Sequence, residues 1–127
     1  MPDRVTYEFA MIRLVPKVER EEFLNIGVVV MSRPKKYLGI KFKLDEERIT
    51  AFSKDVDLAL IHEYLKAWQL ICQGSPHGGA IGKMDLTSRY RWLVSTRSTM
   101  IQCSETHPGL CDDPAQVLED LWQRYVA

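Results

Sequence analysis

The chain has 127 residues, of which 46% are hydrophobic, and 17 Lys and Arg balance 17 Asp and Glu to a net charge of zero. This length predicts a single domain spanning 1–127 with one buried core, and the zero charge argues against a strongly basic nucleic-acid binder. The longest apolar run, Ile26–Met31, is too short to span a bilayer, and the N-terminal sequence has no secretory signal. We therefore expect a soluble cytoplasmic protein whose three cysteines are reduced.

The first part of the chain predicts three strands. Residues 5–15 are apolar at both alternating positions, which is typical of a strand covered on both faces. Ile26–Met31 is a second, valine-rich buried strand, and Arg33–Lys36 is a turn. Residues 37–44 alternate in polarity, so we expect a half-buried strand that forms an antiparallel hairpin with the second, its lysines guarding an exposed face.

Helical patterns follow the strands. Asp45 predicts the N-cap of a short helix that ends near Phe52. Residues 56–73 predict a long amphipathic helix. Its apolar stripe contains Ile61, Tyr64, Leu65, Trp68, Ile71 and Cys72. Residues 74–82 hold four of the seven glycines and predict a mobile loop.

The remaining elements complete an α+β fold. Residues 85–94 fit both a helix and a strand; we favour a helix, followed by a strand over 99–103. Asp113-Pro114 predicts the start of a last helix, with Gln116 at the spacing of a capping box. Its expected buried stripe contains Val117, Leu118, Leu121, Trp122 and Tyr125. The order of elements predicts a small antiparallel or mixed sheet of three to four strands packed with three to four helices.

Common catalytic and cofactor motifs are missing from the sequence. Gly82-Lys83 ends the glycine-rich segment, but a P-loop needs glycine where His77 stands and a hydroxyl where Met84 stands, and it must follow a strand. G-x-S-x-G, H-E-x-x-H, paired C-x-x-C and G-x-G-x-x-G do not occur. We therefore expect no cofactor, and we favour a protein that is not an enzyme while leaving that question open.

Cysteine and histidine recur at regular spacing near the C-terminus, as Cys103, His107 and Cys111. Thiolate and imidazole groups suit Zn²⁺, but this spacing is not that of a standard zinc knuckle. Pro108-Gly109 also interrupts any helix that would align the three side chains. We favour ordinary buried cysteines and predict no metal site.

The segment Arg33–Lys43 holds five basic residues and no acidic one, with Tyr37 and Phe42 between them. Such a stretch could follow the phosphate backbone of a nucleic acid. The commoner role of clustered lysines on a hairpin is to keep an edge strand soluble. Nucleic-acid binding is therefore the less favoured interpretation.

Two polar sets are candidates for binding an anion or a partner. Arg13 lies at an apolar position of the first predicted strand, where a charge needs a partner. It either pairs with Glu21 or Glu22 and fixes the turn before Asn25, or it points into a cleft for an anion. The second set surrounds the fourth predicted strand and contains Arg91, Arg97, Ser98, Gln102, Ser104 and His107. These groups suit a phosphate or carboxylate, and histidine ordinarily exchanges a proton near neutral pH, but structural hydrogen bonding is the alternative.

Two stretches of sequence carry a family resemblance. The first combines Tyr7–Pro16 with Arg20–Val29, whose E-F-x-N-x-G-V pattern is the more specific part. The second combines Arg97–Gln102 with His107, Gly109-Leu110 and Asp113-Pro114. Together they resemble a bacterial family catalogued as domain of unknown function 3037. The resemblance implies that the family features are Arg13, Glu22, Asn25, Gly27, Arg97, Gln102 and Asp113. It implies no activity, and because relatives are often encoded beside HipA-like kinases, it implies such a kinase as a partner.

Three functions remain open. We favour a non-catalytic protein-interaction module, with a HipA-like kinase as its partner. The alternatives are an enzyme or binding protein for a phosphorylated small molecule and a nucleic-acid accessory protein that uses residues 33–43. The candidate anion- or partner-binding residues are Arg13, Glu22, Asn25, Arg91, Arg97, Ser98, Gln102 and His107.

Overall fold

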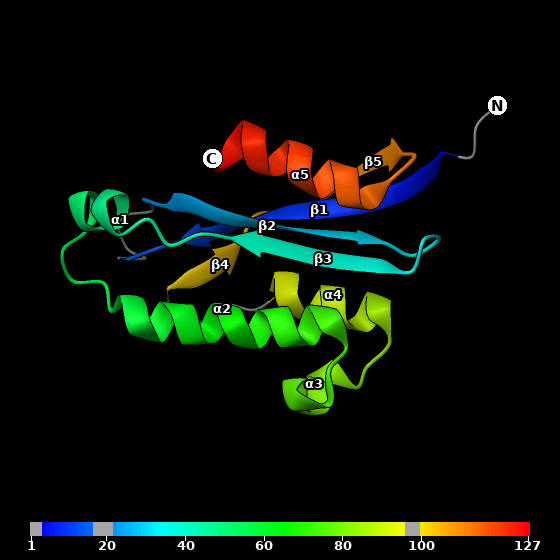
Figure 1. Ribbon diagram of the computed structural model, residues 1–127, viewed down its shortest axis with the longest axis horizontal. Coiled ribbons are helices and arrows are strands. Elements are labelled where there is room, and N and C mark those ends of the chain that lie inside the picture. The colour runs from blue at the N-terminus through cyan, green and yellow to red at the C-terminus, as the bar shows by residue number, and fades with distance from the viewer. Residues whose placement is uncertain (1–3, 17–21, 96–99) are drawn as a thin grey trace.

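The computed structural model describes residues 4–16, 22–95 and 100–127, and it confirms the α+β class. Within these residues, a five-stranded antiparallel sheet lies between α5 on one face and α2 and α4 on the other (Figure 1). The elements are β1 (Val5–Leu14), β2 (Leu24–Ser32), β3 (Tyr37–Phe42), α1 (Glu46–Phe52), α2 (Leu58–Gln73), η2 (Pro76–Gly78), α3 (Gly79–Gly82), α4 (Leu86–Ser95), β4 (Ile101–Cys103), β5 (His107–Cys111) and α5 (Pro114–Tyr125). No helix among the described residues is both long and apolar enough to cross a membrane.

The sheet is organised around β1, which has neighbours along both of its edges. The strand order is β3-β2-β1-β4, and β5 also pairs with β1. On one edge, β2 follows β1 from Glu8 to Leu14. On the other edge, β4 pairs with Ile12–Leu14 and β5 with Val5–Phe9. Two short strands therefore share one edge of β1, and a gap in the pairing falls between them.

The two faces of β1 contribute to two different apolar clusters. Ala10, Ile12 and Leu14 belong to the cluster beneath α2 and α4. Met11 belongs to the second cluster, with Val28, Val30, Leu121, Trp122 and Val126. Burial of one such side chain stabilises the folded state by about 1.5–3 kcal/mol. Because apolar side chains project from both faces, helices are needed on both sides of the sheet. The prediction of a strand covered on both sides is confirmed.

The helix starts follow the sequence signals closely. The Asp45 side chain accepts a hydrogen bond from the Arg48 amide at the start of α1, and Asp57 accepts one from Leu60 at the start of α2. Gly74 ends α2 at a φ of 68°, a left-handed conformation that favours glycine. The predicted stripes were too wide, because Tyr64 and Tyr125 are 43% and 46% exposed. A tyrosine at the edge of an apolar stripe keeps its hydroxyl in water.

Two segments form short regular elements that the sequence did not predict. The glycine-rich segment folds as η2 and α3, and Ser75 caps η2 by accepting a hydrogen bond from the His77 amide. Residues 107–111 form β5, a strand that the sequence did not predict. An edge strand tolerates proline, and Gly109 leaves the space that the Tyr7 ring occupies, 2.5 Å from where a Cβ would stand.

Of the two lysines predicted on an exposed face, Lys43 is exposed, whereas Lys41 on β3 is half-buried because α5 lies against it. Lys41 Nζ is 2.7 Å from Glu119 Oε2 and 5.1 Å from the centre of the Trp122 ring. The predicted capping box is also wrong, since Gln116 donates its side-chain hydrogen bond forward to Asp120. Asp113 itself does cap α5, accepting from the Ala115 amide.

Candidate functional site

An open cleft of about 450 Å³ lies on the α5 side of the sheet. It is lined by Phe9, Met11, Arg13, Asn25, Ser104, His107 and Tyr125. We call it the Arg13 cleft. Alternate residues of β1 form its floor, because side chains two apart on a strand share a face. Three predicted site residues, Arg13, Asn25 and His107, therefore meet in one place.

A β-bulge brings Asn25 to Arg13. Ile12 pairs with Gly27, but the next residue, Arg13, pairs with Asn25, so Ile26 is an extra residue in β2. If the register continued without a bulge, Ile26 would pair with Arg13, and Asn25 would stand opposite Leu14 and point into the core beneath α2. A one-residue shift of register exchanges the two faces of a strand. The bulge thus moves a polar side chain from the core to the cleft.

The Arg13 guanidinium is only partly matched by the protein. Its Cζ lies 4.0 Å from the centre of the Phe23 ring, a cation–π contact. Arg13 Nε is buried and has no hydrogen-bond partner among the described residues. Glu21, one of the two partners predicted for Arg13, lies outside the described residues. A residue that lines the cleft thus has a buried N–H group whose bonding capacity is unused.

Asn25 presents the complementary group. Its Oδ1 is also buried and also has no hydrogen-bond partner within the described residues. Leaving a buried donor or acceptor unpaired costs about 1–3 kcal/mol, and native proteins contain few of them. One unsatisfied donor and one unsatisfied acceptor therefore lie on paired residues of adjacent strands.

Ser104 closes the gap between β4 and β5. Its hydroxyl accepts a hydrogen bond from the Met11 amide at 2.8 Å and donates one to the Glu105 carbonyl at 3.0 Å. The Ser104 amide also donates to the Met11 carbonyl. This buried hydroxyl is committed to the backbone, so its role in the cleft is structural.

Aromatic rings surround the mouth of the cleft. The exposed His107 ring lies 5.2 Å from the Phe9 ring at an interplanar angle of 40°. Phe23, which stacks on Arg13, is 42% exposed, and Tyr125 is 46% exposed. Glu22 precedes Phe23 and is exposed, while Gln102 pairs with Arg13 on β4 and does not line the cleft.

Arg91 lies elsewhere, which divides the second predicted set. It projects from α4 and binds Glu8 with both nitrogens, at 2.8 and 2.7 Å. The hydrogen bonds that Arg91 donates to Glu8 raise the pKa of Arg91. Glu8 alternates with Phe9 on β1 and therefore belongs to the opposite face of the sheet. Arg97 and Ser98 lie outside the described residues.

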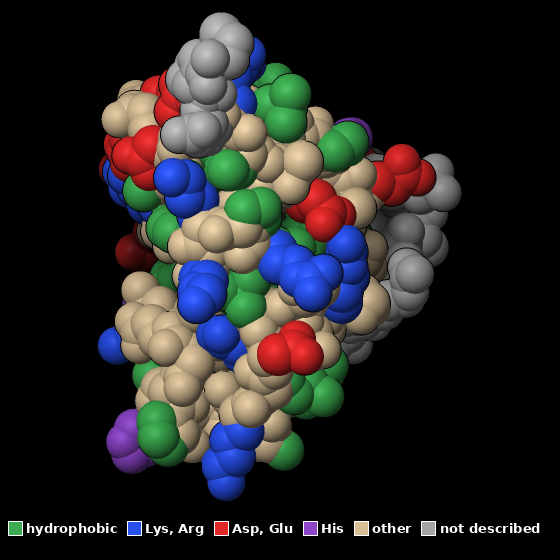
Figure 2. Space-filling model, turned by 90° about the vertical axis from the view of Figure 1, so that its right-hand side faces the viewer, with side chains coloured by type: hydrophobic (Ala, Val, Ile, Leu, Met, Phe, Trp, Pro, Cys, Tyr) green, Lys and Arg blue, Asp and Glu red, His purple; other side chains and the backbone are tan. Residues whose placement is uncertain are grey.

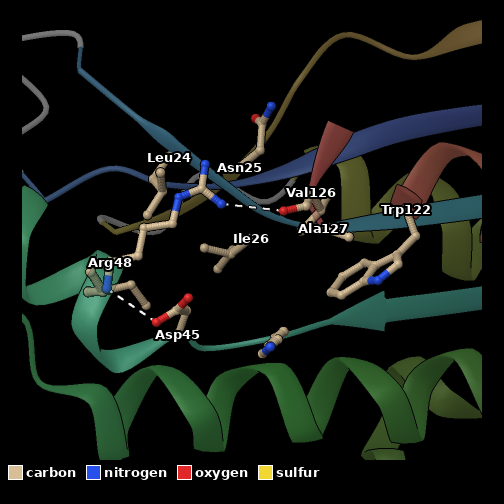
Figure 3. Close-up of a pocket in the computed structure, with 10 residues that line it drawn as sticks. Leu24, Asn25, Ile26, Asp45, Arg48, Trp122, Val126 and Ala127 are labelled. Carbon is tan, nitrogen blue, oxygen red and sulfur yellow. Dashed lines mark hydrogen bonds between the residues drawn. The ribbon is translucent and has the colours of Figure 1, made fainter. Parts of the chain in front are cut away.

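A second, smaller cavity of about 220 Å³ adjoins the Arg13 cleft at Asn25, which lines both. Figure 3 shows Arg48 on one side of it and the Trp122 indole on the other, with Ile26 between them. Its remaining lining residues are Leu24, Lys43, Asp45, Ile49, Val126 and Ala127. We call it the Lys43 cavity. The last turn of α5 separates the two spaces, because Tyr125 lines one and Val126 the other.

The basic hairpin does not form one continuous surface. Arg33, Lys35 and Lys36 are exposed in the β2–β3 turn, and Figure 2 looks onto that end of the molecule, where blue side chains gather. Lys41 is paired with Glu119, and Lys43 lines the second cavity. A three-residue patch is a smaller electrostatic footprint for a nucleic acid than the sequence had indicated.

The cysteines do not gather around a metal. Among the described residues, no group of three or more His, Cys, Asp or Glu side chains is arranged to hold a metal ion. Burial raises the pKa of both the Cys72 and the Cys103 thiol to about 12. Both therefore remain protonated at neutral pH, a form that neither ligates metals nor attacks substrates well.

A family model described as "Protein of unknown function (DUF3037)" matches residues 9–126. The chain belongs to the DUF3037 family. The DUF3037 match contains every residue that lines the Arg13 cleft, from Phe9 to Tyr125. No curated protein and no solved structure matches the chain.

Sequence reasoning identified part of this DUF3037 cleft and missed its aromatic rim. Arg13, Asn25, Ser104 and His107 were candidates before the fold was known. Phe23 was overlooked, although it directly follows the acidic segment beside Asn25 in sequence. Tyr125 was assigned to the core because its helical spacing matches that of Leu121 and Trp122.

Proposed function

We propose that the protein is a non-catalytic interaction module that binds a segment of a partner protein in the Arg13 cleft. The observation that carries this proposal is the pair of unsatisfied buried atoms, Arg13 Nε and Asn25 Oδ1. A peptide group offers a carbonyl oxygen to the first and an N–H to the second. The two atoms lie on paired residues, so neighbouring peptide groups of one extended segment suit them both.

The surroundings of the cleft support a protein ligand. Arginine and aromatic residues are enriched where protein interfaces gain most of their affinity. Phe23 and Tyr125 are such residues, partly exposed beside an open cleft. Ser104 carries the aliphatic hydroxyl in the cleft lining, the type of group that can act as a nucleophile. This hydroxyl accepts a hydrogen bond from one backbone group and donates one to another. This arrangement favours binding over covalent chemistry.

The first experiment uses isolated peptide groups as the probe. We expect N-acetyl-trialanine amide to shift the side-chain N–H signals of Arg13 and Asn25 in ¹H–¹⁵N NMR spectra of the full chain. Arg13→Lys removes the Nε–H group but keeps the charge, and Asn25→Leu removes the acceptor. Each should weaken binding by about tenfold or more, the effect of removing a key interface contact.

The control for this titration is Arg91→Gln. Arg91 is also exposed, but its guanidinium binds Glu8 on the other face of the sheet. This substitution should leave the peptide affinity unchanged. Peptide-induced shifts that survive both Arg13→Lys and Asn25→Leu would contradict a site in this cleft.

A HipA-like kinase is the partner that the family resemblance suggests. We expect a purified kinase of this type to co-elute with the protein in size-exclusion chromatography and to lose affinity with Arg13→Lys but not with Arg91→Gln. Absence of a complex with the unmodified protein would exclude this kinase and leave the peptide titration as the test of the cleft.

A phosphorylated small molecule is the second candidate, favoured by the meeting of Arg13 and His107 in one cleft. A phosphate accepts hydrogen bonds from both side chains, but it leaves the Asn25 acceptor unsatisfied unless it also carries a donor. Titration with inorganic phosphate and with glycerol 3-phosphate separates the two candidates. Shifts at Arg13 and His107 with these anions, and none with the peptide, would favour the small molecule.

A further inference from the structure

The Lys43 cavity next to the Arg13 cleft has a charge of its own. Lys43, which follows β3, and Arg48, on α1, both line it. Within the described residues, no ion pair engages either of them. Asp45, the other charged side chain in the lining, already accepts a hydrogen bond from the Arg48 amide at the start of α1. The charged side chains in the lining are thus two cations and one carboxylate.

The cavity has apolar side chains in its remaining wall, together with Asn25, Val126 and Ala127. Ile26, Ile49 and Trp122 enclose it, and Arg48 Nη1 donates to the Val126 carbonyl at 3.3 Å, which holds the guanidinium beside the end of α5. Sites for drug-sized ligands span about 300–1,000 Å³. At about 220 Å³, this cavity is suited to a single side chain.

Asn25 connects this cavity to the Arg13 cleft, because it lines both. A peptide group that donates its N–H to Asn25 Oδ1 places the neighbouring side chain of the same segment at the entrance to the Lys43 cavity. That side chain meets apolar side chains together with one ammonium group and one guanidinium group. A short aliphatic stem that ends in a carboxylate complements both.

We infer that the partner segment carries an aspartate or glutamate side chain that enters the Lys43 cavity. This inference rests on the proposed function, since it assumes that the Arg13 cleft holds the segment. Lys43 and Arg48 then select the partner by charge, while Arg13 and Asn25 bind its main chain. Exposed charge pairs contribute little to affinity but discriminate between partners.

The test is a selection of random dodecapeptides displayed on phage through their C-termini, so that only side chains present carboxylates. Binders that depend on Arg13 are then synthesised with an amidated C-terminus, each with its acidic residue and with the matching Glu→Gln or Asp→Asn change. We expect the acidic peptide to bind about two- to fivefold more tightly at low salt, the range of an exposed ion pair. The preference should shrink in about 1 M NaCl, where the Debye length falls to about 3 Å.

Lys43→Gln should reduce this preference, leaving the part that Arg48 supplies, while the neutral peptide keeps its affinity. Lys66→Gln is the matched control, because Lys66 is an exposed lysine on α2 that lines neither cavity. An unchanged preference in Lys43→Gln would overturn the inference. So would Arg13-dependent peptides without an enriched acidic residue, although the proposed function would then stand. The neutral peptide is also compared with and without its C-terminal amide. If the free C-terminus tightens binding as much as the acidic side chain does, the carboxylate comes from a chain end, and the inference is overturned. If no Arg13-dependent peptide is enriched, the proposed function and the inference both fail.

Discussion

Arg13 has a polar group that the fold leaves unused. Its guanidinium contacts the Phe23 ring, yet its Nε–H is buried and has no acceptor among the described residues. A cation–π contact at a partly exposed site contributes about 0.5–1 kcal/mol, whereas an unsatisfied buried donor costs about 1–3 kcal/mol. The balance at this residue is unfavourable to folding and becomes favourable only when a ligand supplies an acceptor.

Arg13→Met should therefore stabilise the free protein. Methionine preserves an unbranched apolar stem and removes the unsatisfied donor, so we expect the free energy of unfolding to rise by about 1 kcal/mol. Urea unfolding monitored by circular dichroism measures this change, and the same variant should no longer bind N-acetyl-trialanine amide. A loss of stability of more than about 1 kcal/mol would show that Arg13 serves the fold rather than the ligand.

At the scale of the elements, the meeting of β2 and β3 depends on a glycine next to the bulge. A Cβ at Gly27 would lie 2.7 Å from the Lys41 carbonyl oxygen, whereas a Cβ at Gly109 would lie 2.5 Å from the Tyr7 ring. The first obstacle is backbone in a paired strand. The second is a side chain that is half-buried and can rotate away.

Gly27→Ala should consequently destabilise the protein more than Gly109→Ala. Overpacking against fixed neighbours costs about 1–3 kcal/mol, and we place Gly27→Ala near the top of that range and Gly109→Ala near the bottom. Thermal unfolding of the two variants compares them directly. Equal losses would mean that Tyr7 is held as rigidly as the strand backbone.

The N-terminus of α5 offers a second comparison. Asp113 accepts a hydrogen bond from the Ala115 amide, while Gln116 bonds to Asp120 and not to the cap. Asp113→Ala should cost about 1 kcal/mol, the usual effect of losing an N-cap side chain. Gln116→Ala should cost less than about 0.5 kcal/mol, the size of one exposed pair on a helix. A similar loss of stability in both variants, measured by urea unfolding, would indicate that Gln116 does contribute to a capping box.

Periodicity and caps predicted most of the elements, because β1, β2 and α2 have long and unambiguous patterns. β5 was missed because Pro108 and Gly109 are unfavourable in strands when only the local sequence is considered. Its strand geometry comes from pairing with β1, which lies about a hundred residues earlier in the chain. In the same way, Arg13 and Asn25 were both candidates, but the bulge at Ile26 that joins them has no local sequence signal.

At the scale of the whole molecule, three acidic protons are held in the layer beneath α2 and α4. Burial raises the pKa of Cys72, Tyr90 and Cys103 to about 12 in each case. The folded state thus retains protons that the unfolded chain begins to lose near pH 8.5 for thiols and near pH 10 for tyrosine. Their contribution to stability is complete below about pH 8 and is lost as the pH rises toward 12.

We expect the urea midpoint to fall steadily between pH 8.5 and 10.5. The double variant Cys72→Ala and Cys103→Ala should be less stable at neutral pH but should show a shallower decline, because only Tyr90 of the three groups remains. Urea titrations at several pH values compare the two slopes. A midpoint for the unmodified protein that does not change over this range would contradict protonated, buried thiols.

The divided edge of β1 affects the order in which the molecule can fold. β1, β2 and β3 are consecutive in the chain and pair as neighbours, so they can associate early, whereas β5 joins Val5 to Cys111 and closes a loop of roughly a hundred residues. Ser104 and His107 complete the Arg13 cleft from this late-pairing segment. In a stopped-flow refolding experiment, the ability to bind a peptide should therefore appear with the slowest phase, after most of the secondary structure has formed.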